Sequence, residues 1–186
     1  TYSGADYGFS LPEELTQRLV EVSQSEGVTL HMLLMAVFQT LLHRYTGQLD
    51  INVGTPVSGR SQAETEAMIG FFLNMLVIRT NFEENPTFRE LLKQVRRTSL
   101  DAYAHQEFPF EKLVDVLQPE RSLSHSPLFQ VSFSTVNISD QTLDLPGLQV
   151  SSLAGESNTA KFDLALLILE GTDNLTGNLE YNTDLF

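Results

Sequence analysis

The stretch "GFFLNMLVIRTNF" runs from Gly70 to Phe82 and is apolar almost throughout. Its length and the β-branched Val77 and Ile78 predict a buried strand in its second half. Asn74 interrupts the run, and a buried amide costs free energy unless it is hydrogen-bonded. Two interpretations stay open: Asn74 bonds the backbone of a neighbouring loop, or it lines a cleft. Arg79 lies an odd number of residues away and therefore faces the opposite side of a strand, where we expect a structural role, paired to a carboxylate on the helix side.

Helices and strands are predicted on both sides of this run. Before it, a helix opens at Pro12, and Thr29 can cap a second helix. A strand follows over residues 50–57. The second helix carries a broad apolar stripe that we expect to be buried over more than one face: Leu30, Leu33, Leu34, Val37, Phe38, Leu41, Leu42 and Tyr45.

After the run, the order of elements changes from helices to strands. Thr87 and Glu90 have the spacing of a capping box, which predicts a helix start. A shorter helix follows, and then alternation and apolar runs predict three strands: 129–135, 162–169 and 175–181. The predicted fold class is α/β, with a mixed sheet layered with helices in a single domain over 1–186.

Composition excludes several function classes. The 24 acidic and 11 basic residues give a net charge of −13, which disfavours binding to nucleic acid. No apolar run reaches the roughly 18 residues needed to span a membrane. Cysteine is absent, which excludes disulfides and thiolate metal sites and is compatible with a cytoplasmic location.

Local catalytic and metal-binding motifs are also absent. The four histidines form no H-x-x-x-H or H-E-x-x-H pair. His31 and His43 share a helix but lie about 120° apart around it, so we expect helix-surface or capping roles and no metal site. Neither a G-x-S-x-G elbow nor a glycine-rich phosphate loop occurs.

The stretch "HQEFPFEKL", residues 105–113, is a second unusual feature. Pro109 suits the first turn of a helix, Glu111 complements the helix dipole there, and Phe110 can pack with the following apolar residues. This accounts for the residues from Pro109 onward. It leaves the preceding His105-Gln106-Glu107 unexplained.

Taken together, these stretches resemble the condensation domains of nonribosomal peptide synthetases. "IGFFLNMLVIR" (69–79) is similar to their G-x-F-x-N-x-x-x-x-R motif, and "HQEFPFE" to their H-Q-D-Y-P-F-E motif, with Glu and Phe in place of Asp and Tyr. "RSLSHSPLFQ" (121–130) resembles R-D-x-S-R-x-P-L-F-Q, with departures at Ser122 and His125. "GTPVSGR" (54–60) also matches. The resemblance assigns structural roles to these motif residues: Arg79, His105, Gln106, Glu107, Pro109, Phe110, Glu111, Arg121 and Pro127.

The resemblance implies half of a chloramphenicol acetyltransferase-like fold. The catalytic motif of the family, H-H-x-x-x-D-G, lies in its N-terminal lobe, and no His-His pair occurs here. We therefore expect the C-terminal lobe alone, with no catalytic residue of its own and no activity in isolation. The missing N-terminal lobe is one expected partner, and the surface that it would cover is expected to be exposed, where a second copy could dock.

The same resemblance implies the activity. Phosphopantetheine arms of donor and acceptor carrier proteins meet in a tunnel, and the acceptor amine attacks the donor thioester to form an amide. No cofactor is expected to bind the chain directly, and an adjacent adenylation domain is a further expected partner. A floor loop is expected at about 58–74 and a latch at about 136–161, with Asn74, Ser58 and Arg60 as tunnel candidates.

Other members of the superfamily remain alternatives. An epimerization or heterocyclization domain would carry similar motifs in this lobe. A catalytically dead module that recruits partner proteins would also look the same. The sequence does not specify the amino acids joined, the donor stereochemistry or the peptide product.

Overall fold

A computed structural model describes residues 3–120, 125–137, 148, 158–171 and 174–186, which build a six-stranded mixed sheet. The strand order is β1-β6-β5-β4-β2-β3, and the pairs β2–β4 and β4–β5 are parallel while the others are antiparallel. This confirms the predicted mixed sheet. The strands are β1 (Gly4–Ser10), β2 (Asp50–Val57), β3 (Asn74–Asn81), β4 (Val131–Asn137), β5 (Leu164–Glu170) and β6 (Leu175–Asn182).

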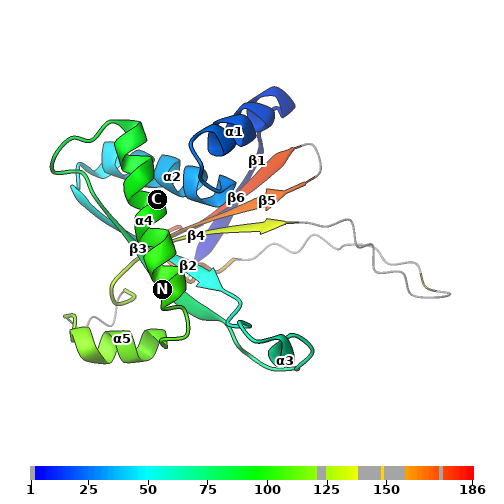
Figure 1. The fold of residues 1–186 in the computed structure, drawn as a ribbon. Helices are drawn as coiled ribbons and strands as arrows, with labels where there is room; N and C mark the ends of the chain where they lie inside the picture. The colour runs from blue at the N-terminus through cyan, green and yellow to red at the C-terminus, as the bar shows by residue number, and fades with distance from the viewer. Residues whose placement is uncertain (1–2, 121–124, 138–147, 149–157, 172–173) are drawn as a thin grey trace.

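The described part of the chain has five helices, and Figure 1 shows their arrangement around the sheet. They are α1 (Glu13–Ser25), α2 (Leu30–Thr46), α3 (Ala63–Glu66), α4 (Phe88–Ala104) and α5 (Phe110–Leu117). The predicted caps are confirmed: the Thr29 hydroxyl accepts from the backbone of Met32, and Thr87 and Glu90 form a complete capping box. α2 and α4 pack together against the sheet, whereas α5 lies apart from them and contacts β3.

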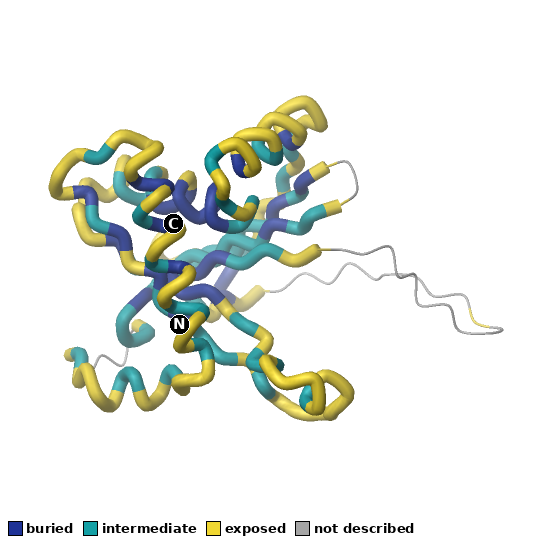
Figure 2. The backbone as a smooth tube through the Cα atoms, in the orientation of Figure 1, coloured by how far each residue is buried: buried dark blue, intermediate teal, exposed yellow. Residues whose placement is uncertain are grey.

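The hydrophobic core lies between α2, α4 and the central strands (Figure 2). Its centre is formed by fully buried side chains of these elements: Met35, Val53, Ile78, Val95 and Phe133. One polar pair is buried among them, because Gln39 donates to the Ile78 carbonyl (2.9 Å) and accepts from the Thr80 hydroxyl (2.8 Å). These bonds satisfy an amide that would otherwise be costly to bury and tie α2 to β3.

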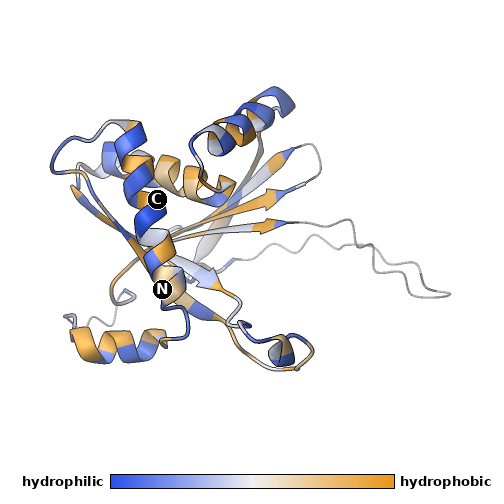
Figure 3. Cartoon of the chain, in the orientation of Figure 1, coloured by the Kyte–Doolittle hydropathy of each residue, from blue (hydrophilic) through white to orange (hydrophobic). Residues whose placement is uncertain are grey.

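The predicted stripe of α2 needs correction. Figure 3 shows α2 as largely hydrophobic, and seven of its residues are buried. Val37, Leu41 and Tyr45, however, are exposed, and Met35 and Gln39 are buried instead. The three exposed residues lie four positions apart and form one face of the helix, which no element in the described part of the chain covers.

Among the described residues, no single helix is long and apolar enough to cross a membrane. α1 and α2 meet the length and composition test only as a pair, and that pair is bent by 105°.

Candidate functional site

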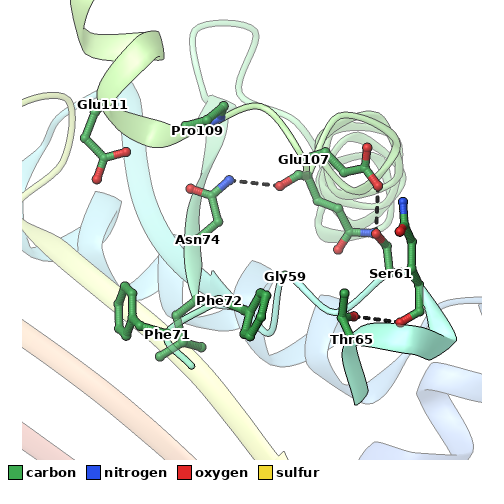
Figure 4. A pocket seen from close by; sticks show the side chains of 12 residues that line it. Gly59, Ser61, Thr65, Phe71, Phe72, Asn74, Glu107, Pro109 and Glu111 are labelled. Atoms are coloured by element: carbon green, nitrogen blue, oxygen red, sulfur yellow. Dashed lines mark hydrogen bonds between the residues drawn. The ribbon is translucent and has the colours of Figure 1, made fainter. Parts of the chain in front are cut away.

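A pocket with a volume of about 480 Å³ lies where the loop 58–73 meets the turn 105–109 (Figure 4). One wall comes from Gly59, Ser61, Gln62, Thr65, Phe71, Phe72 and Leu73, and the other from Asn74, Gln106, Glu107, Pro109 and Glu111. The lining combines two carboxylates with amide, hydroxyl and phenyl groups. No lysine or arginine is among these lining residues, so the pocket favours amine or neutral ligands over phosphate.

The Asn74 amide ties the start of β3, where the loop 58–73 ends, to the turn and the start of α5. Its nitrogen donates to the carbonyl oxygens of Gln106 (2.9 Å) and Phe108 (2.8 Å), and its oxygen accepts from the backbone N–H of Phe110 (3.0 Å). The interpretation that Asn74 bonds a neighbouring loop backbone is therefore confirmed. Both amide hydrogens are used, but the oxygen retains one lone pair for a further donor.

The loop 58–73 has a defined internal structure built around Arg60. Its guanidinium donates to the carbonyls of Thr65 and Gly70 and lies over the Phe72 ring, 4.4 Å from the centroid. Gly59 has a φ of 63°, and a Cβ there would lie 1.8 Å from the Phe72 carbonyl oxygen, so only glycine fits. The chain thus folds back on itself before β3 begins.

A second bond links the loop to the turn. The Ser61 hydroxyl donates to a carboxylate oxygen of Glu107 at 2.7 Å (Figure 4). This length is typical of a charge-assisted hydrogen bond. The tip of the loop carries large exposed side chains, since Ile69 and Phe71 are almost fully accessible.

The three tunnel candidates are placed differently. Asn74 lines the pocket, whereas Ser58 and Arg60 are not among its lining residues. Arg60 is engaged inside the loop, and the Ser58 hydroxyl accepts from the Arg60 backbone N–H (3.4 Å). Their tunnel role stays a prediction.

Arg79 has the carboxylate partner that the sequence predicts, but not at the predicted place. Its guanidinium makes two bonds to Asp50 at the start of β2, at 2.9 and 2.7 Å. These bonds lower the pKa of the Asp50 carboxyl and raise that of Arg79. Arg79 is exposed and alternates with the buried Ile78 and Thr80, so the pair lies on the sheet face away from the α2–α4 core and not on the helix side.

Several of the remaining motif residues contact backbone atoms, precede a helix or pack against another ring. The His105 ring contacts the Asp101 carbonyl at the end of α4 (2.9 Å), and Pro109 precedes α5. The Phe110 ring meets Phe129 at 5.5 Å, and Pro127 accepts a backbone bond from Phe129. Arg121 lies outside the described residues, as does most of the predicted latch (138–147 and 149–157).

One histidine contradicts the expected surface or capping role. His31 is largely buried, with its Nδ1 3.1 Å from the Thr135 hydroxyl, and burial lowers its pKa to about 4. His43 does act at the end of α2, where its ring contacts the Gln48 carbonyl (2.7 Å) and stacks on Phe82. In the described part of the chain, no three His, Cys, Asp or Glu side chains lie together in a way that could hold a metal ion.

Several pocket residues were not singled out as such from the sequence, although the expected floor loop at about 58–74 includes three of them. Ser61, Gln62 and Thr65 belong to a polar loop that gives no periodic signal. Glu107 was assigned to the scaffold, although its carboxylate lies in the pocket wall. The sequence predicted a buried strand only for the second half of the apolar run, and the fold shows that Phe71 in the first half is exposed.

The comparisons with known proteins agree with the motifs. Over the whole chain, 50% of residues are identical to one of the linear gramicidin synthase proteins of Brevibacillus parabrevis, of which the chain covers 2%. Malpinin synthetase of Mortierella alpina is 43% identical over 93% of the chain, which covers 2% of that protein. The chain therefore spans a small part of these relatives.

Solved structures give the same result. The X-domain of teicoplanin biosynthesis, solved in complex with OxyB, matches with a TM-score of 0.89 and 29% identity over 98% of this chain and 41% of that chain. The four-domain nonribosomal peptide synthetase holo-AB3403, bound to AMP and glycine, matches with a TM-score of 0.84 and 26% identity over 97% of this chain and 15% of that one. A family model described as Condensation domain matches residues 1–186. The chain belongs to the condensation-domain family of nonribosomal peptide synthetases.

Proposed function

We propose that this chain is the C-terminal lobe of a domain that forms peptide bonds between substrates held as phosphopantetheine thioesters on carrier proteins. The observation that carries the proposal is the pocket, where residues of two family motifs meet through the three bonds of Asn74. The high identity to a peptide synthetase over the whole chain supports it. A cytoplasmic location, as expected from the sequence, completes the proposal.

The chemistry of the pocket lining suits such a substrate. A phosphopantetheine arm alternates amide groups with short alkyl links, and the lining offers hydrogen-bonding groups at Ser61 and Gln62 beside the rings of Phe71 and Phe72. The carboxylates disfavour the phosphate itself, which would stay outside. Asn74 would hold an amide N–H through the free lone pair of its oxygen.

The residues of this lobe would act by positioning. In the proposed reaction the acceptor amine nitrogen bonds to the thioester carbon, the C–S bond breaks, and the amine proton ends on the released thiol. Holding both groups in a shared pocket lowers the entropic cost of their encounter. The chain contains no His-His pair, so we assign the acid–base groups to the N-terminal lobe.

A second candidate function is recruitment without catalysis. It is favoured by one observation, the high structural similarity to an X-domain solved in complex with OxyB. A domain of this kind would bind its partners through the same fold and form no amide.

An assay with loaded carrier proteins separates the two functions. The full-length protein that contains this chain is mixed with an aminoacyl donor carrier and an aminoacyl acceptor carrier, and the acceptor is analysed by intact-protein mass spectrometry. Condensation predicts that the mass of the acceptor carrier increases by one amino-acid residue, the one transferred from the donor. Binding of both carriers without that product would support recruitment and overturn the proposed reaction.

A further inference from the structure

The pocket depends on a loop that carries few buried side chains. Across 61–73, no residue is buried, and Ile69 and Phe71 are almost fully exposed. A loop with so few apolar contacts is held chiefly by its polar bonds. The residues that make these bonds therefore determine where the wall of the pocket lies.

The loop is joined to the turn 105–109 near both of its ends. At the C-terminal end, Asn74 begins β3 and bonds the turn backbone. Near the N-terminal end, the described contacts to the turn include one side-chain bond, from the Ser61 hydroxyl to the Glu107 carboxylate at 2.7 Å. These partners are 46 residues apart in sequence, so the bond fixes tertiary and not local structure.

A shift at Ser61 would be transmitted to the pocket wall. The neighbouring Arg60 donates hydrogen bonds to the carbonyls of Thr65 and Gly70, and its guanidinium stacks on the ring of Phe72. Phe72 and Thr65 both line the pocket. Because these contacts tie the loop together, displacement of its N-terminal end moves the wall as a unit.

We propose that Glu107 is a positioning residue, which acts through Ser61 to hold the loop 58–73 against the turn and so fixes the width of the pocket. The catalytic part of this inference rests on the proposed function. The carboxylate is not assigned a role in proton transfer, and its task is to accept one hydrogen bond at a set distance.

The length of the side chain then matters more than its charge. Glu107→Asp removes one methylene and would lengthen the 2.7 Å contact to about 4 Å, beyond hydrogen-bonding range. Glu107→Gln keeps the length and an acceptor oxygen but removes the charge. A charge-based role predicts the opposite order, because Asp would retain function and Gln would lose it.

The test uses the full-length protein and measures both amide formation between loaded carriers and hydrogen exchange of residues 58–73. We expect Glu107→Ala, Glu107→Asp and Ser61→Ala each to lower kcat/KM about three- to tenfold and to raise exchange in the loop. Glu107→Gln should stay within about twofold of the unmodified protein, because it keeps an acceptor oxygen at the same distance, and the weaker bond of a neutral acceptor accounts for the small loss. The double variant Ser61→Ala/Glu107→Ala should be no worse than either single variant, because both remove the same bond.

Glu64→Ala is the matched control. Glu64 lies in α3 on the same loop, is exposed, and makes no side-chain hydrogen bond or ion pair within the described residues. It should leave both measurements unchanged. The positioning role would be overturned if Glu107→Ala kept full activity and unchanged hydrogen exchange. It would also be overturned if Glu107→Asp kept activity while Glu107→Gln lost it. If the unmodified protein forms no amide, the proposed function fails. The exchange data alone then decide whether the bond between Ser61 and Glu107 holds the loop 58–73 against the turn.

Discussion

Replacing Asn74 by alanine removes three hydrogen bonds at once and leaves two carbonyls and one N–H of the turn without their partner. A net hydrogen bond contributes about 0.5–1.5 kcal/mol, so three set an upper range of roughly 1.5–4.5 kcal/mol. The site is partly exposed, and water can replace part of the loss. We therefore expect Asn74→Ala to lower the free energy of unfolding by about 2 kcal/mol.

Asn74→Asp sharpens this prediction. Aspartate keeps the acceptor for the Phe110 N–H but places a carboxylate oxygen against the carbonyls of Gln106 and Phe108, which lie 2.8–2.9 Å away. Two acceptors at that distance repel, so the charged and nearly isosteric residue should destabilise at least as much as alanine.

The assay is chemical denaturation followed by far-UV circular dichroism, with Asn81→Ala as the control. Asn81 ends the same strand, and its side chain accepts one exposed bond, from the Glu83 N–H (2.7 Å), so we expect a loss below about 1 kcal/mol. Asn74 variants within about 0.5 kcal/mol of the unmodified protein, or an Asp variant as stable as it, would refute the reasoning.

Three further predictions concern stability and are measured by the same denaturation. The pKa of His31 is about 4 in the folded protein and about 6.5 when unfolded, so the unfolded state binds more protons between these values, and stability should fall by roughly 2 kcal/mol from pH 7.5 to pH 5. His31→Gln should remove that part of the loss. Gly59→Ala should lower the free energy of unfolding more than Gly47→Ala does. Both glycines have positive φ, but only at Gly59 would the new Cβ meet a carbonyl oxygen. Gln39→Leu should lower the free energy of unfolding by about 2–3 kcal/mol. Adding Thr80→Val to that variant should lower it further by less than Thr80→Val does in the unmodified protein, because the two side chains share a buried hydrogen bond. The first prediction would be contradicted if the His31 variant had the same pH dependence of stability as the unmodified protein. The second would be contradicted by equal losses of unfolding free energy for the two glycine variants, and the third by additive losses for Gln39→Leu and Thr80→Val.

The local elements could be predicted from the sequence because their signals are local. The alternation of Ile51 and Val53 gave β2 with the bounds that the structure has. The pair Thr87 and Glu90 gave the start of α4. In both cases neighbouring residues contain the whole physical reason for the element.

Tertiary choices were harder to predict. The apolar stripe of α2 was broad enough to fit the sheet at several rotations, and packing buried Met35 and Gln39 while leaving Leu41 exposed. His31 gave no sign that it would face the strand β4, because one residue has no periodicity. The partner of Arg79 also depends on the pairing of β2 with β3.

The site was only half predictable for the same reason. Asn74 was conspicuous as one amide in an apolar run, but its partners lie 32–36 residues later and are backbone atoms. The bond between Ser61 and Glu107 joins two exposed side chains whose sequence neighbours give no hint of the contact. Such contacts follow from the fold and not from local pattern.

The most direct test of the proposed division of roles compares the full-length protein with residues 1–186 alone in the two-carrier assay. We assign the acid–base groups to the N-terminal lobe and the pocket wall to this chain. We therefore expect an amide product on the acceptor carrier with the full-length protein and none with residues 1–186. Product formed by residues 1–186 alone would contradict this division of roles, and no product from the full-length protein with correctly loaded carriers would contradict the proposed reaction.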